Sequence, residues 1–124
     1  MKYSIVVADD HPIFRKGLID ILSEMSSIEI VAEVSDGIEA YRSIIAKRPD
    51  IAILDLEMPG LTGIDVCKKV LSEKSETKFI ILTMHREKTY FTDALNMGVK
   101  GYILKDNAIT ELITCVEKVL KGEF

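Results

Sequence analysis

One short stretch, residues 51–60, constrains the fold of this chain more than any other. It reads Ile-Ala-Ile-Leu-Asp-Leu-Glu-Met-Pro-Gly, an apolar run that ends in Asp55 and breaks at Pro59-Gly60. A run this short and this apolar predicts a strand buried on both faces, which is typical of a parallel sheet. Because a buried carboxylate without a partner is costly, Asp55 must meet a cation, a donor or solvent where the strand ends.

The rest of the sequence alternates apolar runs with amphipathic segments. β-Branched and apolar runs predict strands, and apolar residues at helical spacing predict a helix after each strand. The expected strands cover residues 3–8, 28–34, 50–56, 79–83 and 101–105. The expected helices begin at Pro12, with Asp10 or His11 as the cap, near Gly37, after an N-cap at Thr62, after residues 84–87, and at Asn107. The first of these helices extends to about Glu24.

This order of elements, a strand followed by a helix five times, indicates a single α/β domain over residues 1–124. Five strands are too few for a closed eight-stranded barrel. We therefore expect a doubly wound (βα)5 fold, flavodoxin-like and three-layered, with a five-stranded parallel sheet in the order 2-1-3-4-5. In such sheets the functional site lies beyond the carboxyl ends of the strands next to the point where the strand order reverses.

Composition excludes several classes of protein. Of 124 residues 48% are hydrophobic and 29% charged, and the net charge is −4, so direct binding to nucleic acid or to an anionic membrane is not expected. No apolar run approaches the ~20 residues that a membrane span requires. Cys67 and Cys115 lack the spacing of a metal site, which favours reduced thiols in a soluble cytoplasmic protein.

Acidic residues end two of the expected strands. Asp9 and Asp10 follow the first strand and Asp55 ends the third, so the sheet should bring them to one edge. Three carboxylates at one place repel, which should raise the pKa of at least one of them, and a divalent cation would remove this repulsion. Oxygen ligands favour Mg²⁺ over zinc. Helix capping and solvation are the alternative for Asp9 and Asp10, but capping explains only one of the two acids.

A hydroxyl and a cation end two further strands, at Thr83 and Lys105. We expect Thr83 to supply a hydrogen-bond donor and Lys105 a mobile charge, so that together they could clamp an anion with several oxygens. Phosphoryl transfer needs a nucleophile, a metal and cations around the phosphoryl oxygens. A carboxylate such as Asp55 can be the nucleophile and then forms an acyl phosphate.

Four segments together resemble the receiver domain of two-component response regulators, over essentially the whole chain. They are Val7-Ala-Asp-Asp-His-Pro12, Leu54-Asp-Leu-Glu-Met-Pro-Gly60 with Gly63, Leu82-Thr83, and Gly101-Tyr-Ile-Leu-Lys105. The first and last of these segments are most similar to the NarL/FixJ (LuxR-type) subfamily. Its members usually carry an additional helix-turn-helix domain that binds DNA.

The resemblance implies a phosphorylation site and a metal site. Asp55 would accept a phosphoryl group from the phosphohistidine of a sensor histidine kinase. Mg²⁺ would be held by Asp10, Asp55 and the main-chain carbonyl of Glu57, with Asp9 reaching it through water. The domain would then be a signalling switch, capable only of its own phosphorylation and dephosphorylation.

The resemblance also assigns residues to the phosphoryl group and to the conformational response. Thr83 and Lys105 would bind phosphoryl oxygens, and Tyr102 would be the aromatic that turns inward when Thr83 moves. Glu57 and His85 occupy positions that influence the lifetime of the phosphoryl group in this family. Many receivers have proline after the lysine, whereas this chain has Asp106, so a trans peptide is expected there.

Two other kinds of protein, a phosphatase and a cofactor-binding module, share part of this pattern. A haloacid-dehalogenase-like phosphatase would also use a strand-end nucleophile such as Asp55, but it requires a second Asp where this chain has Glu57. A flavodoxin-like cofactor module would need a Ser/Thr/Gly-rich phosphate loop after the first strand, where this chain has the diacid Asp9-Asp10. Repulsion between the diacid and a phosphate argues against that module.

The signalling output is expected to lie on residues 86–121, which should repack when Thr83 and Tyr102 shift. We expect a homodimer favoured by phosphorylation, formed through the last helix or the first. Their apolar residues are Ile109, Leu112, Ile113, Val116, Val119 and Leu120 on the last helix, and Ile13, Ile19 and Leu22 on the first. An equal alternative is that these residues belong to the core. A DNA-binding effector domain would lie beyond residue 124, and we expect a receiver trimmed from a longer regulator rather than a single-domain protein.

Overall fold

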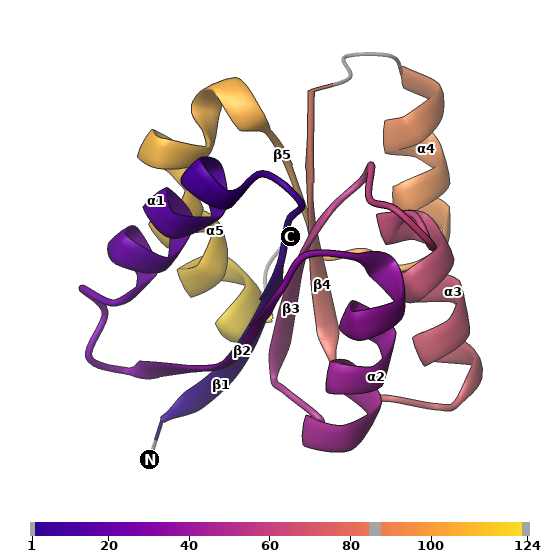
Figure 1. The fold of residues 1–124 in the computed structure, drawn as a ribbon, viewed down its shortest axis with the longest axis horizontal. Coiled ribbons are helices and arrows are strands. Elements are labelled where there is room, and N and C mark those ends of the chain that lie inside the picture. Colours follow the sequence, from indigo (N-terminus) through magenta and orange to yellow (C-terminus); the bar gives the residue numbers. More distant parts are fainter. Residues whose placement is uncertain (1, 85–87, 123–124) are drawn as a thin grey trace.

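The computed structural model describes residues 2–84 and 88–122, and its elements alternate between strands and helices as predicted (Figure 1). The order is β1 (Tyr3–Ala8), α1 (Pro12–Leu22), β2 (Ile28–Val34), α2 (Gly37–Lys47), β3 (Ile51–Asp55), α3 (Gly63–Ser72), β4 (Lys78–Thr83), α4 (Lys88–Asn96), β5 (Gly101–Leu104), a short 3-10 helix (Lys105–Asn107) and α5 (Ala108–Leu120).

The five strands form one parallel sheet in the order β2-β1-β3-β4-β5, which confirms the predicted doubly wound fold. Helices α1 and α5 cover one face of the sheet, and α2, α3 and α4 cover the other (Figure 1). Ala8 pairs with Leu54, and Asp55 with Leu82. This register brings the carboxyl ends of β1, β3 and β4 to the same edge, which is where the site was expected.

Each face of the sheet has its own core, because successive strand residues point to opposite sides. Ile5, Val7 and Ile53 pack with the helices α1 and α5, whereas Val6 and Leu54 pack with α2 and α3. All five residues of β3 are buried, as expected of a central parallel strand. The strand that carries Asp55 is therefore held from both sides.

The two cores also account for much of the apolar stripe considered for dimerisation. Leu112, Val116 and Val119 of α5 and Leu22 of α1 are fully or almost fully buried inside the domain, so they cannot form a surface for a partner. For these four residues the dimer interpretation is wrong and the core interpretation is correct. Ile13 and Ile109 remain exposed on α1 and α5.

Local sequence signals explain how α2 and α3 begin. The Asp36 carboxylate accepts a hydrogen bond from the Glu39 backbone N–H, and Thr62 forms a reciprocal capping box with Asp65. These caps satisfy backbone donors that a helix leaves unpaired at its first turn. The predicted cap at Thr62 is confirmed, and α3 therefore begins immediately after the loop that follows Asp55.

Several predicted element boundaries differ from the structure by one or two residues. Helix α1 ends at Leu22 rather than near Glu24, because the backbone N–H of Glu24 donates to Ile21 in a tighter last turn. Strand β5 ends at Leu104, and Lys105 begins the 3-10 helix instead of closing the strand. Neither His11 nor Asn107 caps its helix through its side chain.

The peptide after Lys105 is trans, as predicted, since the described residues contain no cis peptide bond. The approach to α4 through His85, Arg86 and Glu87 falls outside the described residues. Among the described residues, no helix is long and apolar enough to cross a membrane.

Candidate functional site

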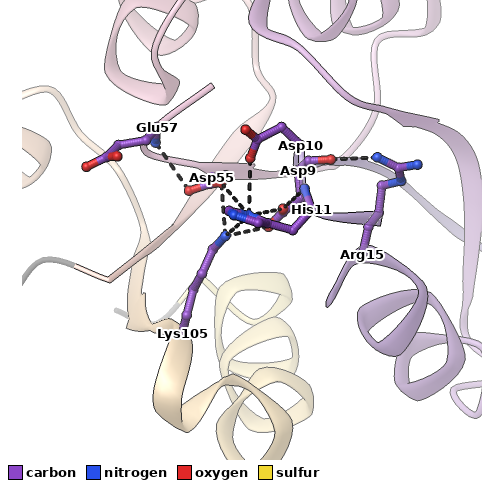
Figure 2. Close-up of polar contacts among 7 residues, drawn as sticks. All are labelled: Asp9, Asp10, His11, Arg15, Asp55, Glu57 and Lys105. Carbon is purple, nitrogen blue, oxygen red and sulfur yellow. Dashed lines mark hydrogen bonds and ion pairs between the residues drawn. The ribbon is translucent and has the colours of Figure 1, made fainter. Parts of the chain in front are cut away.

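The carboxyl edge of the sheet brings together acidic and basic side chains from three separate elements (Figure 2). Asp9 and Asp10 follow β1, Asp55 is the last residue of β3, and Lys105 is the first residue after β5. Parallel strands deliver their ends to one edge, and this is why residues so far apart in sequence meet there. The structure thus places four of the predicted site residues in one cluster.

Lys105 is the central cation of this cluster. Its Nζ donates to Asp55 Oδ2 at 2.9 Å and forms an ion pair with Asp9 Oδ2 at 3.0 Å. The side chains of all three residues are at most 6% exposed. The ring of Phe14 lies 4.8 Å from the same ammonium and holds it from the α1 side. Lys105 is therefore a buried charge that is paired with two carboxylates.

The Asp55 carboxylate is fixed by its own loop as well. Its Oδ1 accepts a hydrogen bond from the Glu57 backbone N–H at 3.2 Å, and the Leu56 N–H donates to the Leu82 carbonyl at 2.7 Å. The α3 residue Gly63 lies so close that a Cβ there would be 2.6 Å from the main-chain oxygen of Asp55. A glycine is required at this position because the helix approaches the backbone of β3 directly.

The pKa of Asp55 is raised to about 6, mainly by burial, which outweighs the lowering effect of the Lys105 hydrogen bond and charge; the charge of Asp9 adds to the rise. The expectation that one carboxyl would have a raised pKa is confirmed, although burial rather than mutual repulsion is the main cause. Burial also acts to lower the pKa of Lys105, but Asp55 and Asp9 outweigh it and the net shift is upward. The ammonium is thus charged at neutral pH.

The same residues form a set of potential metal ligands. Ligand atoms of Asp9, Asp10, His11 and Asp55 all lie within 4.8 Å of one another. Asp10 Oδ1 is buried and lies 3.2 Å from His11 Nδ1, with no hydrogen bond to it among the described residues. Carboxylate oxygens in this number fit a hard divalent cation such as Mg²⁺. This part of the site can therefore hold a metal ion.

Two residues of the site were not predicted. His11, assigned only as a helix cap, has its Nδ1 3.2 Å from both Lys105 Nζ and Asp10 Oδ1, and 3.3 Å from Asp9 Oδ1. Arg15 donates from Nη1 to the main-chain oxygen of Asp9 at 2.6 Å. Both residues lie at the start of α1, right after the diacid, but this position alone does not show that their side chains contact the acids.

The remaining predicted residues, Thr83, Tyr102 and Glu57, have different surroundings. Thr83 is the last residue of β4, next to β3, and is fully buried. Tyr102 lies on β5 and packs edge-to-face against Phe91 of α4, with 5.2 Å between ring centroids. The Glu57 side chain is exposed and points away from Asp55 (Figure 2). His85 lies outside the described residues.

A comparison with known families matches residues 5–117 to the response regulator receiver domain. Among curated proteins, the oxygen regulatory protein NreC from Staphylococcus epidermidis is 43% identical over 120 residues, which cover 96% of this chain and 55% of NreC. NreC from Staphylococcus aureus strain JH9 is 40% identical over the same length and coverage. The chain therefore spans little more than half the length of these relatives.

Solved structures agree with this match. The signal receiver domain of NarL from Mycobacterium tuberculosis superimposes with a TM-score of 0.93 at 38% identity, covering 98% of both chains. A DNA-binding response regulator of the LuxR family from Staphylococcus aureus gives a TM-score of 0.89 at 32% identity, covering 94% of this chain and 98% of that one.

The chain belongs to the response regulator receiver domain family. Its relatives are regulators of the NarL and LuxR type, so the resemblance seen in the sequence is confirmed. Such domains are signalling switches that sensor kinases phosphorylate. The comparisons support neither the haloacid-dehalogenase-like phosphatase nor the flavodoxin-like cofactor module.

Proposed function

We propose that Asp55 accepts a phosphoryl group from the phosphohistidine of a sensor histidine kinase in a Mg²⁺-dependent reaction. The observation that carries this proposal is the buried Asp55 carboxylate, held 2.9 Å from Lys105 beside two further acids. A carboxylate oxygen of Asp55 attacks phosphorus as the bond from phosphorus to the kinase histidine nitrogen breaks. The product is an acyl phosphate on Asp55.

Different groups around Asp55 would bind the metal ion and the phosphoryl group. Asp10, Asp55 and the main-chain carbonyl of Glu57 would hold Mg²⁺, with Asp9 acting through water. When bound, the ion neutralises charge on the phosphoryl oxygens. Lys105, already next to Asp55 Oδ2, and Thr83, at the end of the neighbouring strand, would bind phosphoryl oxygens from the other side. The buried setting strengthens each of these charge interactions.

The phosphorylated domain would be a switch, and it would not catalyse a reaction on a separate substrate. Its chemistry is limited to its own phosphorylation and to hydrolysis of its own acyl phosphate. Movement of Thr83 toward the phosphoryl group would let Tyr102 turn inward from its packing against Phe91. Because Phe91 belongs to α4, this movement would repack the surface formed by α4, β5 and α5.

We also propose that the domain, residues 1–124, controls a DNA-binding effector domain in a longer cytoplasmic regulator. The curated relatives are nearly twice as long as the part that this chain matches, and one similar solved structure is a DNA-binding response regulator. The receiver itself, with a net charge of −4, would not contact DNA.

The phosphorylation site is tested by replacing Asp55 with Asn. Wild-type protein incubated with Mg²⁺ and acetyl phosphate should gain one phosphoryl group, measured by intact mass, and Asp55→Asn should gain none because an amide is a poor nucleophile. Asp20→Asn, an exposed change on α1, is the matched control and should be labelled like the wild type. Labelling of Asp55→Asn to the same extent would refute the assignment.

A homodimer favoured by phosphorylation is a further part of the proposal, and the exposed Ile13 and Ile109 are the apolar side chains that could contribute to it. Sedimentation velocity should show a shift from monomer to dimer when beryllofluoride and Mg²⁺ are added. Ile109→Asp should reduce this shift if α5 supplies the contact, and Ile13→Asp should do so if α1 supplies it. A wild-type protein that stays monomeric with beryllofluoride would contradict the proposal.

A further inference from the structure

We propose that Arg15 is a positioning residue for the metal site, acting through the peptide that joins Asp9 to Asp10. This inference rests on the magnesium site of the proposed function. Arg15 Nη1 donates to the main-chain oxygen of Asp9 at 2.6 Å, and the Asp9 N–H donates to the Val34 carbonyl of β2 at 3.1 Å. The backbone of Asp9 is thus held by a partner on each side.

The carbonyl that Arg15 binds belongs to the same planar peptide unit as the Asp10 nitrogen. Fixing that plane fixes the direction in which Asp10 leaves the backbone. Asp10 needs this support, because it lies in the loop between β1 and α1 and its side chain is 33% exposed, whereas that of Asp9 is fully buried. Arg15 is therefore placed to hold the less constrained of the two adjacent acids.

Arg15 is itself well anchored. It lies in the first turn of α1, where its backbone N–H donates to the His11 carbonyl, and its side chain is only 20% exposed. Its Nε lies 3.8 Å from Glu33 Oε1 on β2, so one planar guanidinium faces both the Asp9 carbonyl and a carboxylate. Figure 2 shows this side chain directed at the Asp9 backbone from the side opposite Lys105. A planar fork with several donors suits this double role.

Charge and geometry make opposite predictions for the loss of Arg15. If Arg15 acted only as a positive charge near the acids, it would repel a divalent cation, and its removal would tighten Mg²⁺ binding. If it positions the Asp9–Asp10 peptide, its removal loosens a ligand and weakens binding. Residues that orient metal ligands typically contribute about 10-fold or more to metal affinity.

The test compares Arg15→Met, which keeps an unbranched apolar stem but has no donor, with Lys16→Met, which removes the same charge from the exposed neighbouring position. Mg²⁺ affinity is measured by titration of backbone amide signals in ¹⁵N NMR spectra, which also report whether each variant is folded. Arg15→Met should bind Mg²⁺ about 10-fold more weakly than wild type. Lys16→Met should bind at least as tightly as wild type.

A metal-free measurement separates this inference from the proposed function. The ¹⁵N signal of the Asp10 amide should move in Arg15→Met before any Mg²⁺ is added, because the Asp9 carbonyl of the same peptide unit has lost a hydrogen bond. The same signal should not move in Lys16→Met. Unchanged or tighter Mg²⁺ binding by Arg15→Met would overturn the positioning role while leaving the magnesium site intact. Failure of wild-type protein to bind Mg²⁺ would instead overturn the proposed function.

Discussion

Replacing Lys105 with methionine will lower the free energy of unfolding of the metal-free protein at pH 7.5 by about 3 kcal/mol. Lys105 Nζ lies 2.9 Å from Asp55 and 3.0 Å from Asp9, and both carboxylates are almost fully buried. Removing the ammonium leaves two buried negative charges facing each other without a cation. Uncompensated buried charge is among the few causes of a loss this large from a single substitution.

The loss will be smaller at pH 5, because Asp55 can then bind a proton in place of the ammonium. The pKa of Asp55 is already raised from 3.8 to about 6, so ionising this carboxyl costs stability. The folded protein therefore becomes less stable as the pH rises through this range. Without Lys105 the pKa will rise further, and this cost will extend to higher pH. Urea unfolding at both pH values measures the difference.

Lys68→Met is the matched control for this substitution, because Lys68 is an exposed residue of α3. It should change the free energy of unfolding by no more than about 0.5 kcal/mol at either pH. Addition of Mg²⁺ at pH 7.5 should restore part of the stability of Lys105→Met, since the ion would supply the missing positive charge. An equal loss at pH 5 and pH 7.5 would contradict the electrostatic explanation.

Replacing Gly63 with alanine will destabilise the domain by about 2–3 kcal/mol and slow phosphorylation of Asp55. A Cβ at this position would lie 2.6 Å from the Asp55 main-chain oxygen and 3.2 Å from Leu56 Cα. Both neighbours are backbone atoms of the segment that carries Asp55, so no side-chain rotation can relieve the clash. The start of α3 and the end of β3 must move apart.

Gly17→Ala provides the control, because the added Cβ would meet nothing within 4 Å inside helix α1. It should raise the free energy of unfolding by about 0.5–1 kcal/mol, since alanine is the better helix former. Urea unfolding gives both changes in stability, and intact mass after timed incubation with acetyl phosphate gives the labelling rate. A Gly63→Ala variant as stable and as rapidly labelled as wild type would contradict the proposed close approach.

The sequence was sufficient to predict the fold because its signals are periodic and local. Buried strands appear as short apolar runs, helices as apolar residues at helical spacing, and the alternation of the two leaves few possible topologies. The acids Asp9, Asp10 and Asp55 were predictable for the same reason, since parallel strands end at one edge. Element ends, such as Leu22 and Leu104, were less accurate because single hydrogen bonds decide them.

The roles of His11, Arg15 and the burial of Lys105 could not be predicted, because they depend on three-dimensional contacts that leave no periodic pattern. His11 and Arg15 look like ordinary first-turn residues until α1 is placed against the acids. Lys105 looks exposed at the end of a strand, but Phe14 and two carboxylates enclose it. The same limit applies to the apolar residues of α5, whose pattern is identical for a core face and an interface.

The ion pair of Asp55 with Lys105 joins residues 50 positions apart, and the contact of Lys105 with His11 joins residues 94 apart. Closing such long loops costs chain entropy before the contacts are gained, which slows the assembly of this cluster. A newly synthesised chain would contain Asp55 long before the lysine that completes its surroundings. The ion pair between Asp55 and Lys105 cannot form until residue 105 has been synthesised, so this edge of the sheet is completed late in translation.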